Sequence, residues 1–340
     1  MAVTIREIAK KVGMSPSTVS QALSGKGKLR WETRKRIRAA ARELGYYLPD
    51  DPFGINPVIS GRPIRIVFGG QSQVPDAQNI GSFAAKVLEG VQAVLSSYRT
   101  HLVWGCDADA GVLLPGLIGN LVIGGAVSNG LVQALEATHL PAVIVGCHVE
   151  PCSSLGAVET DAIQGIRMAV GYLYELGHRK IGLLNGSAST RTSDQKLTGF
   201  LRACHDFGLS SSCVASVDPP WSFDHALPVA RSLLAGPWSD VTAVIAAYET
   251  LAAAVLQVCR DLGRSVPGDV SVVAYHDENL AESTTPKLTA VSLPLFQMGR
   301  LAATHLVVAS ENSDLVGVRI VLPPRLTVRE STGPAPSRIA

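Results

Sequence analysis

Short, almost continuously apolar runs alternate with amphipathic helical stretches from residue 64 to the end of the chain. Runs of this kind, rich in β-branched residues, are typical of parallel strands covered on both faces. The predicted strands cover residues 64–68, 101–104, 121–123, 142–145, 180–184, 243–246 and 270–275. The predicted helices lie near residues 79–98, 161–176, 193–208, 224–236, 249–263 and 294–310. The alternation predicts a layered α/β fold, and about 270 residues are too many for one small sheet, so we expect two similar lobes. Ligands of such sheets bind at the carboxyl ends of the strands.

The first fifty residues have a helical pattern instead. Thr4, followed three residues later by Glu7, predicts a capping box at the start of a helix that ends at Gly13. Ser15 can cap a second helix over residues 16–23, with Pro16 as its first residue. A third helix is predicted over about residues 31–44. Two short helices joined by a tight glycine turn predict a helix-turn-helix; the alternative is a three-helix bundle without a ligand.

The charge of the chain is concentrated in this helical segment. Residues 1–49 contain eleven lysines and arginines against three acids, a formal charge of +8, whereas the whole chain carries +2. Short polar side chains on the outer face of the second helix suit a major groove: Ser17, Thr18, Ser20 and Gln21. Basic clusters at residues 26–30 and 34–38, which include Lys28 and Arg34, suit phosphates. The pattern predicts an interface for double-stranded DNA.

Several classes of protein are disfavoured by what the sequence lacks. The six cysteines, at positions 106, 147, 152, 204, 213 and 259, have neither disulfide rhythm nor metal-ligand spacing, so we expect buried reduced thiols and no metal. The N-terminus has no apolar signal-peptide segment, and no apolar run is long enough for a membrane span. No phosphate loop, zinc-protease helix or nucleophile elbow is found. We therefore expect a cytoplasmic protein that is neither an enzyme nor dependent on a cofactor.

Residues 3–20, with Thr33-Arg34 and Leu44-Gly45-Tyr46, resemble the headpiece of the LacI/GalR family of transcriptional regulators. The resemblance implies that Thr4, Ser15 and Thr33 contact the DNA backbone. It also implies that Pro16, Ser17 and Gln21 occupy base-reading positions, where Pro16 can make only apolar contacts, such as with a thymine methyl. The complete expected DNA-binding set is Thr4, Ser15, Pro16, Ser17, Thr18, Gln21, Lys28, Thr33 and Arg34.

The resemblance continues through residues 177–181, 266–273, 286–291 and 322–332. It implies two doubly wound α/β lobes of the periplasmic-binding-protein type, a cleft between them, and dimerisation through this domain. Crossovers between the lobes are expected near residues 158–161, 290–293 and 319–322. The expected organisation is a helix-turn-helix headpiece (1–48), a hinge linker (49–63), an effector-binding and dimerisation domain (64–333) and a disordered tail (334–340).

The linker departs from the family pattern. It contains four prolines and two glycines in fifteen residues, which argues against the hinge helix that the family folds on DNA. The family wedges a leucine from this helix into the minor groove, and here Asn56 stands near that place, followed by Pro57. An extended tether is the expected form; the alternative is a substitute wedge made by Ile55, Val58 or Ile59.

The expected effector site also departs from the family pattern. Lys196 stands where the family has a ligand-binding arginine, and Arg191 is a second basic candidate. Tyr248 and His276 stand where the family has side chains that bind sugar hydroxyls. Tyr248 can stack on a ring, and the two cations suit a phosphate or carboxylate. We expect a sugar-like effector or an anionic sugar derivative bound by Arg191, Lys196, Tyr248 and His276; the alternative is an unused pocket.

Together these features predict a dimeric regulator, expected to be a repressor, that binds a pseudo-palindromic operator. A small molecule in the cleft would change its DNA affinity. Two alternatives stay open: a binding protein that uses DNA only as an anchor, and an enzyme with a regulatory headpiece.

Overall fold

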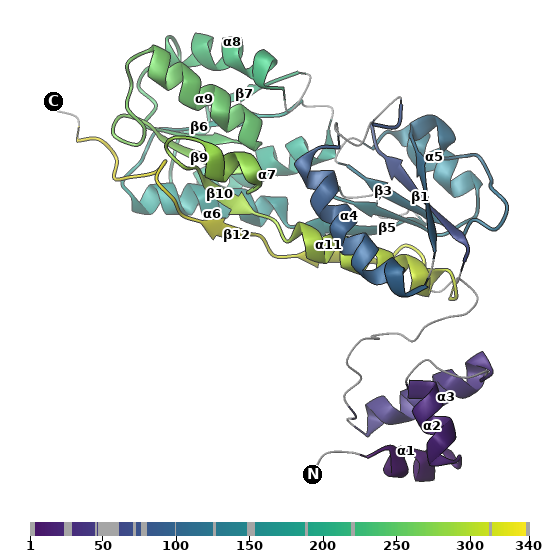
Figure 1. Cartoon of the computed structure of the whole chain (residues 1–340). Helices are drawn as coiled ribbons and strands as arrows, with labels where there is room; N and C mark the ends of the chain where they lie inside the picture. The colour runs from purple at the N-terminus through teal and green to yellow at the C-terminus, as the bar shows by residue number, and fades with distance from the viewer. Residues whose placement is uncertain are drawn as a thin grey trace.

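The computed structural model describes residues 4–23, 29–44, 46, 61–70, 73–75, 80–98, 100–124, 127–147, 154–187, 190–218, 222–312 and 315–337. Figure 1 shows a small helical unit at the N-terminal end and two α/β lobes. The expected fold class, a helical headpiece followed by two parallel-sheet lobes, is confirmed.

Three short helices form the headpiece: α1 (Ile5–Val12), α2 (Pro16–Leu23) and α3 (Trp31–Glu43). The capping box is confirmed, because the Glu7 carboxylate accepts the Thr4 N–H at 2.7 Å and the Thr4 hydroxyl accepts the Glu7 N–H at 3.4 Å. Gly13 ends α1 with φ 70°, a left-handed conformation that favours glycine. Ile8, Val19 and Ile37, one from each helix, are fully buried against one another in a common core.

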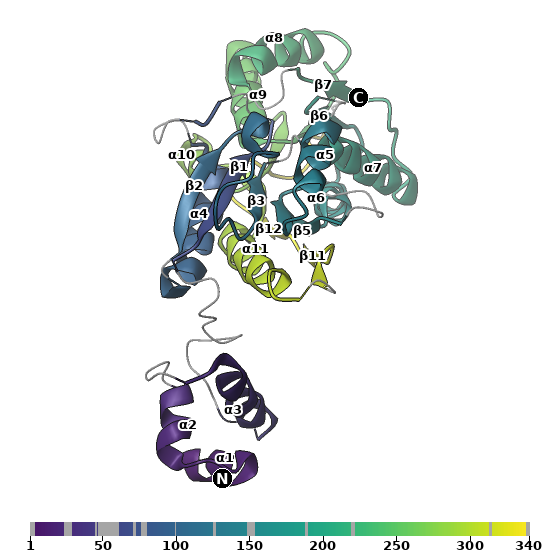
Figure 2. The same cartoon turned by 90° about the vertical axis from the view of Figure 1, so that its right-hand side faces the viewer.

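The first lobe contains a parallel six-stranded sheet in the order β11-β5-β4-β3-β1-β2. Its strands are β1 (Pro63–Phe68), β2 (His101–Gly105), β3 (Asn120–Ile123), β4 (Ala142–Val145), β5 (Gly156–Thr160) and β11 (Arg319–Leu322). Helix α4 (Ser82–Leu95) and helix α11 (Leu295–Ala309) cover one face, and α5 (Asn129–Ala137) covers the other (Figure 2). Two short 3-10 turns, η1 (Ser96–Tyr98) and η2 (Asp107–Asp109), complete the lobe.

The second lobe repeats this architecture with the order β12-β10-β9-β8-β6-β7. Its strands are β6 (Ile181–Asn185), β7 (Val214–Ser216), β8 (Ala243–Ala246), β9 (Ser271–Tyr275), β10 (Thr289–Ser292) and β12 (Arg325–Thr327). All pairs are parallel except β10 with β12. Helices α6 (Ala162–Glu175) and α7 (Arg191–Asp206) cover one face; α8 (Phe223–Leu234) and α9 (Glu249–Asp261) cover the other, and α10 (Asn279–Ser283) lies beside α9.

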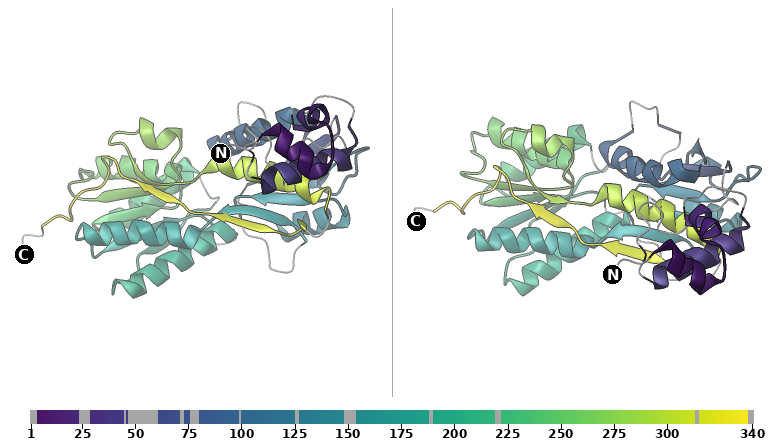
Figure 3. Two further views of the ribbon diagram at one scale, coloured as in Figure 1. Left: turned by 90° about the horizontal axis from the view of Figure 1, so that it is seen from below. Right: turned by 60° about the horizontal axis from the view of Figure 1, so that its bottom comes forward.

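The chain passes between the lobes at three places, as expected. The first crossing joins β5 to α6 and the second joins β10 to α11, both within the predicted ranges or next to them. The third joins β11 to β12 after residue 322, slightly later than predicted, and Figure 3 shows this segment running along both lobes. Three connections constrain how the lobes move relative to each other.

Helices α4 and α11 pack side by side at unusually close range (Figure 3). A Cβ atom placed on Gly299 would overlap the Val87 carbonyl oxygen, and one placed on Gly90 would overlap the Phe296 carbonyl oxygen. Only glycine therefore fits at these two crossing points. Through this contact, α11, which follows the second crossing, packs against the first lobe.

Some local predictions were wrong. Strands β5, β7, β10 and β11 and helices α5 and α10 were not predicted, because these segments are short or lack a strong period. The tail expected to be disordered from residue 334 is bound in its first residues, since the Ala335 N–H donates to the Leu176 carbonyl at 2.8 Å.

Four of the described cysteines are buried free thiols and Cys213 is half-buried; Cys152 lies outside the described residues. Within the described part of the chain, no helix has both the length and the apolar character needed to cross a bilayer.

Candidate functional site

The outer face of α2 presents the expected base-reading positions. Pro16, Ser17 and Gln21 are exposed, whereas Val19 and Ala22 on the inner face are buried. Ser15 caps the helix, because its hydroxyl accepts the Thr18 N–H at 3.1 Å and lies 2.8 Å from the Thr18 hydroxyl. The amphipathic period of α2 thus separates a packing face from a polar face of short side chains.

The residues expected to meet phosphates are not all equally accessible. Thr4 is exposed and Thr33 is half-buried, while Arg34 is only 8% exposed; Lys28 lies outside the described residues. Arg36 donates to the Val12 carbonyl at 2.7 Å, at the C-terminal end of α1. Part of the basic cluster predicted for phosphates therefore holds the headpiece together.

Arg38 has the same structural role at the end of the next helix. It is 6% exposed and donates to the Leu23 carbonyl at 3.1 Å. Because cations suit the carbonyl-rich C-terminal end of a helix, both contacts stabilise the three-helix arrangement.

A cavity of about 530 Å³ lies between the two lobes. The C-terminal ends of strands from both sheets open into it, which is where ligands bind parallel sheets. Side chains from the first lobe, from the second lobe and from the crossing segments all contribute. The lining residues include Phe68, Ile80, Phe83, Ile123, Thr160, Thr192, Gln195, Lys196, Tyr248, Tyr275, His276, Leu293 and Met298.

Lys196 is a buried cation on α7, only 4% exposed. Its Nζ donates to the Ala247 carbonyl at 2.7 Å and lies 4.3 Å from the centroid of the Tyr275 ring. Burial lowers the pKa of Lys196 from 10.5 to about 7. The amine therefore exchanges a proton near neutral pH, and an anion beside it would favour the charged form.

His276 follows β9 in a left-handed conformation, with φ 80°, which turns the chain sharply at the cavity wall. Its ring centroid lies 4.6 Å from that of Tyr248, 5.5 Å from that of Tyr275 and 5.7 Å from that of Phe83. Burial, and then the neighbouring Lys196, hold the pKa of His276 well below 6.5. The imidazole is neutral at physiological pH.

Tyr248 is the N-terminal flanking residue of α9, and its ring closes the cavity beside His276. Burial raises the pKa of both Tyr248 and Tyr275, so both phenols stay protonated. Lys196, Tyr248 and His276, three of the four predicted effector residues, are thus brought together.

Arg191, the fourth, is not among the described residues that line the cavity. It is the first residue of α7, and its helix neighbours Thr192 and Gln195 line the cavity instead. Arg191 and Gln195 are four residues apart and share one face of α7, so the helical period does not separate them; Arg191 lies one turn nearer the N-terminal end of the helix than Gln195.

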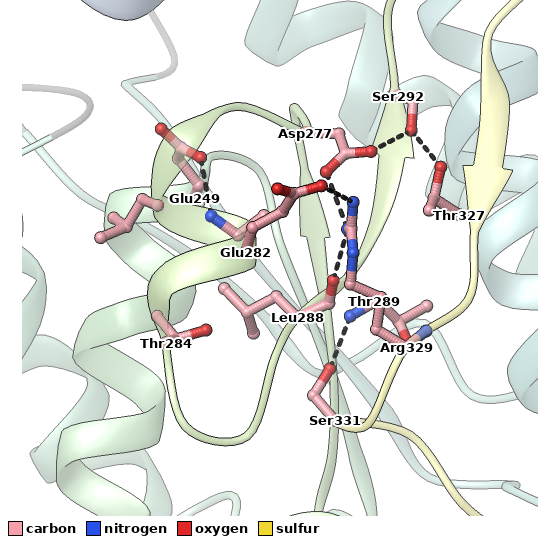
Figure 4. A network of polar contacts seen from close by, with 12 residues as sticks. Glu249, Asp277, Glu282, Thr284, Leu288, Thr289, Ser292, Thr327, Arg329 and Ser331 are labelled. Carbon is pink, nitrogen blue, oxygen red and sulfur yellow. Dashed lines mark hydrogen bonds and ion pairs between the residues drawn. The ribbon is translucent and has the colours of Figure 1, made fainter.

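Asp277, next to His276, does not line the cavity and belongs to a polar network with Ser292 and Arg329 (Figure 4). Its carboxylate pairs with Arg329 at 2.7 Å and accepts a hydrogen bond from the Ser292 hydroxyl at 2.6 Å. Arg329 follows β12, so this ion pair anchors the closing segment of the chain. His276 lines the cavity and Asp277 does not, so the two adjacent residues do not form an acid–base pair.

Two further acids with buried side chains, Glu249 and Glu278, lie close to the cavity wall. The Glu249 carboxylate accepts the Ala281 N–H at 3.2 Å at the start of α10 (Figure 4). Glu278, with a side chain 4% exposed, lies 3.4 Å from His276 Nδ1. Burial raises the pKa of Glu278 to about 8, with smaller contributions from Glu249 and Asp277. None of these three acids lines the cavity.

Several lining residues were not predicted, although a general rule points to them. Phe68, Ile123 and Thr160 each end a strand of the first sheet, and Tyr275 ends one of the second. Combining the carboxyl-end rule with the predicted strands would have found most of them. Phe83 and Met298 carry no such signal, since they reach the cavity only through helix packing.

Two family models match the chain. Residues 4–49 match the bacterial regulatory proteins of the lacI family, and residues 170–332 match the periplasmic binding protein-like domain. The first match covers the headpiece helices, and the second covers most of the second lobe and the segments that cross to the first.

Similar proteins match over nearly the whole chain. Catabolite control protein A of Priestia megaterium is 26% identical over 98% of this chain and 100% of its own length. The HTH-type transcriptional regulator CelR of Thermobifida fusca is 29% identical over 96% of this chain and 98% of its own. The solved structure of a transcriptional regulator CelR–cellobiose complex superposes with a TM-score of 0.71, at 29% identity, covering 97% of this chain and 99% of the other.

Proposed function

Because the chain belongs to the lacI family of DNA-binding transcriptional regulators, we propose that it is a repressor that binds a pseudo-palindromic operator as a dimer. A small molecule in the cavity between the lobes changes its affinity for that operator. The headpiece is assigned to residues 1–48, the linker to 49–63 and the effector domain to 64–333, and the protein acts in the cytoplasm.

The observation that carries the DNA-binding role is the exposed polar face of α2. Ser17 and Gln21 are exposed and carry polar groups that can hydrogen-bond base edges. Thr4 and Ser15 lie exposed at helix starts, which are favourable places for phosphates. A single recognition helix reads only a few base pairs, so a dimer on a two-fold site is needed for selectivity.

The observation that supports effector control is the place of the cavity. Lys196, Tyr248 and His276 come from the second lobe, and Phe68, Phe83 and Ile123 from the first, so a bound molecule would contact both lobes at once. Such a ligand favours one relative position of the lobes. A coupling of about 1–3 kcal/mol between ligand and DNA would be enough for control. CelR has been solved with cellobiose, and a sugar-like effector or an anionic sugar derivative is the starting proposal for this chain.

Selection of random duplex DNA by the full-length protein tests the proposal. An enriched palindrome with constant half-site spacing is the expected result. A preferred central base step would add that the linker reads the minor groove, whereas variable spacing would identify an extended tether. Failure to enrich any sequence, with and without candidate effectors, would overturn the proposed function.

Two further measurements test the dimeric state and the direction of regulation. Sedimentation at micromolar concentration should give a dimer, and a monomer that also binds a single half-site would contradict the dimeric mode. Transcription in vitro from a promoter carrying the selected operator should fall when the protein is added. A rise would show an activator instead.

A further inference from the structure

The effector cavity has an unusual balance of charge. Lys196 is the only lysine, arginine, aspartate or glutamate among its described lining residues. Three acids lie nearby but do not line the cavity: Glu249 caps α10, Asp277 pairs with Arg329, and Glu278 lies 3.4 Å from His276 Nδ1. A ligand that enters the cavity therefore meets a cation and no described carboxylate.

The ammonium group of Lys196 has few partners within the described part of the chain. One of its three N–H groups donates to the Ala247 carbonyl, and the Tyr275 ring covers another side. No described carboxylate forms an ion pair with it. A buried cation of this kind is costly, and an anion at hydrogen-bond distance would offset that cost.

The remaining wall combines aromatic and aliphatic side chains with the neutral polar side chains of Gln73, Thr160, Thr192 and Gln195. Rings of Phe68, Phe83, Tyr248, Tyr275 and His276 line the cavity, together with Ile80, Ile123, Leu293 and Met298. Aromatic walls favour a flat body that can stack or make edge contacts with them. Neutral sugars present many hydroxyl donors, for which carboxylates are the strongest acceptors, and none is present among the described lining residues.

We propose that the cavity selects a small carboxylate carried on a flat, mostly apolar body, with Lys196 binding the carboxylate. This inference rests on the proposed function and replaces its sugar-like ligand with a different class. A phosphate ester fits less well, because a dianion needs more than one cation and Arg191 is not among the described lining residues.

Binding of matched pairs of compounds to the full-length protein tests the assignment. The probes are benzoate, 4-hydroxybenzoate and cinnamate, each compared with its neutral amide by titration calorimetry. At least one carboxylate should bind about tenfold or more tightly than its amide. Lys196→Met should abolish this preference and leave the amide affinity nearly unchanged. Lys86→Met, at an exposed lysine on α4, is the matched control and should change neither.

Three outcomes would overturn the inference. The first is that no carboxylate binds at concentrations up to about 10 mM. The others are that cellobiose, ribose or glucose 6-phosphate binds more tightly than every carboxylate, and that Lys196→Met still prefers a carboxylate over its amide. If Lys196→Met fails to fold, judged by circular dichroism, Lys196→Gln replaces it. DNA selection is scored separately, so a selected operator without carboxylate binding removes only this inference, whereas absence of an operator removes the proposed function.

Discussion

The Nδ1 atom of His276 lies 3.4 Å from the Oε1 atom of Glu278, and both side chains are shielded from solvent. Burial lowers the pKa of the imidazole and raises the pKa of the carboxyl to about 8. At neutral pH the imidazole is therefore neutral and the carboxyl largely keeps its proton. An uncharged polar pair thus supports the wall of the cavity between the lobes.

Glu278→Gln should stabilise the protein progressively as the pH rises. The folded-state pKa of Glu278 lies above the ordinary value of 4.5, so the folded protein holds a proton that the unfolded chain releases. The stability linked to that proton is fully present below pH 4.5 and is lost as the pH rises toward 8. A glutamine cannot ionise, so its advantage over wild type should grow by on the order of 1–3 kcal/mol across this window.

Thermal unfolding at pH 5, 7 and 9 measures this difference. The exposed Glu175→Gln on α6 is the control and should show no comparable trend. Parallel pH profiles for wild type and Glu278→Gln would contradict the argument.

Lys196→Met should make the ligand-free protein more stable near pH 7. The pKa of Lys196 is lowered from 10.5 to about 7, so between these values the unfolded chain binds a proton that the folded protein lacks. Wild-type stability from this group is present above pH 10.5 and is lost as the pH falls toward 7. Methionine cannot ionise and therefore removes that loss. The net gain in the free energy of unfolding at pH 7 should be on the order of 1–3 kcal/mol, after subtraction of about 1 kcal/mol for the lost hydrogen bond to Ala247.

Denaturant titrations at pH 7 and pH 10 distinguish this from a packing effect. The stabilisation should shrink at the higher pH. An equal effect at both values would show that hydrophobic packing alone, and not the buried amine, is responsible.

Gly299→Ala should destabilise the effector domain by more than about 2 kcal/mol. The added methyl group would overlap the Val87 carbonyl oxygen, which is helix backbone and cannot move independently. Gly130→Ala is the matched control on α5, where the nearest atom to the new Cβ is the Ser128 hydroxyl at 3.8 Å. The control should stabilise by about 0.5–1 kcal/mol through helix propensity. Equal calorimetric midpoints for the two variants would show that α4 and α11 separate at little cost.

Gln21→Ala should weaken binding to the selected operator by about 5- to 150-fold, corresponding to about 1–3 kcal/mol for one base contact. Binding to unrelated duplex should stay within about twofold, because phosphate contacts carry nonspecific affinity. Fluorescence anisotropy at constant salt measures both. An equal loss on both duplexes would assign Gln21 to the backbone and leave Ser17 and Pro16 as the candidate base readers.

The sequence by itself determined the features that depend on neighbours along the chain. The capping box of Thr4 and Glu7 and the left-handed stop at Gly13 involve residues three to nine positions apart, so local spacing was sufficient. The buried parallel strands and the two-lobed order were predicted for a similar reason, because burial on both faces leaves an apolar run. Lys196, Tyr248 and His276 were predicted as effector residues from their positions in segments that resemble the LacI/GalR family.

Tertiary structure alone decided what those side chains meet. Arg36 and Arg38 belong to a cluster expected to meet phosphates, and the fold in addition brings each to a carbonyl at the end of a helix, 24 and 15 residues earlier in the chain. Gln195 lines the cavity and Arg191, on the same helix face, does not, because this depends on where α7 lies along the second sheet. The neutral state of His276 and the protonated state of Glu278 arise from burial among elements distant in sequence. Desolvation and contact depend on the whole packed environment, and no local pattern encodes that environment.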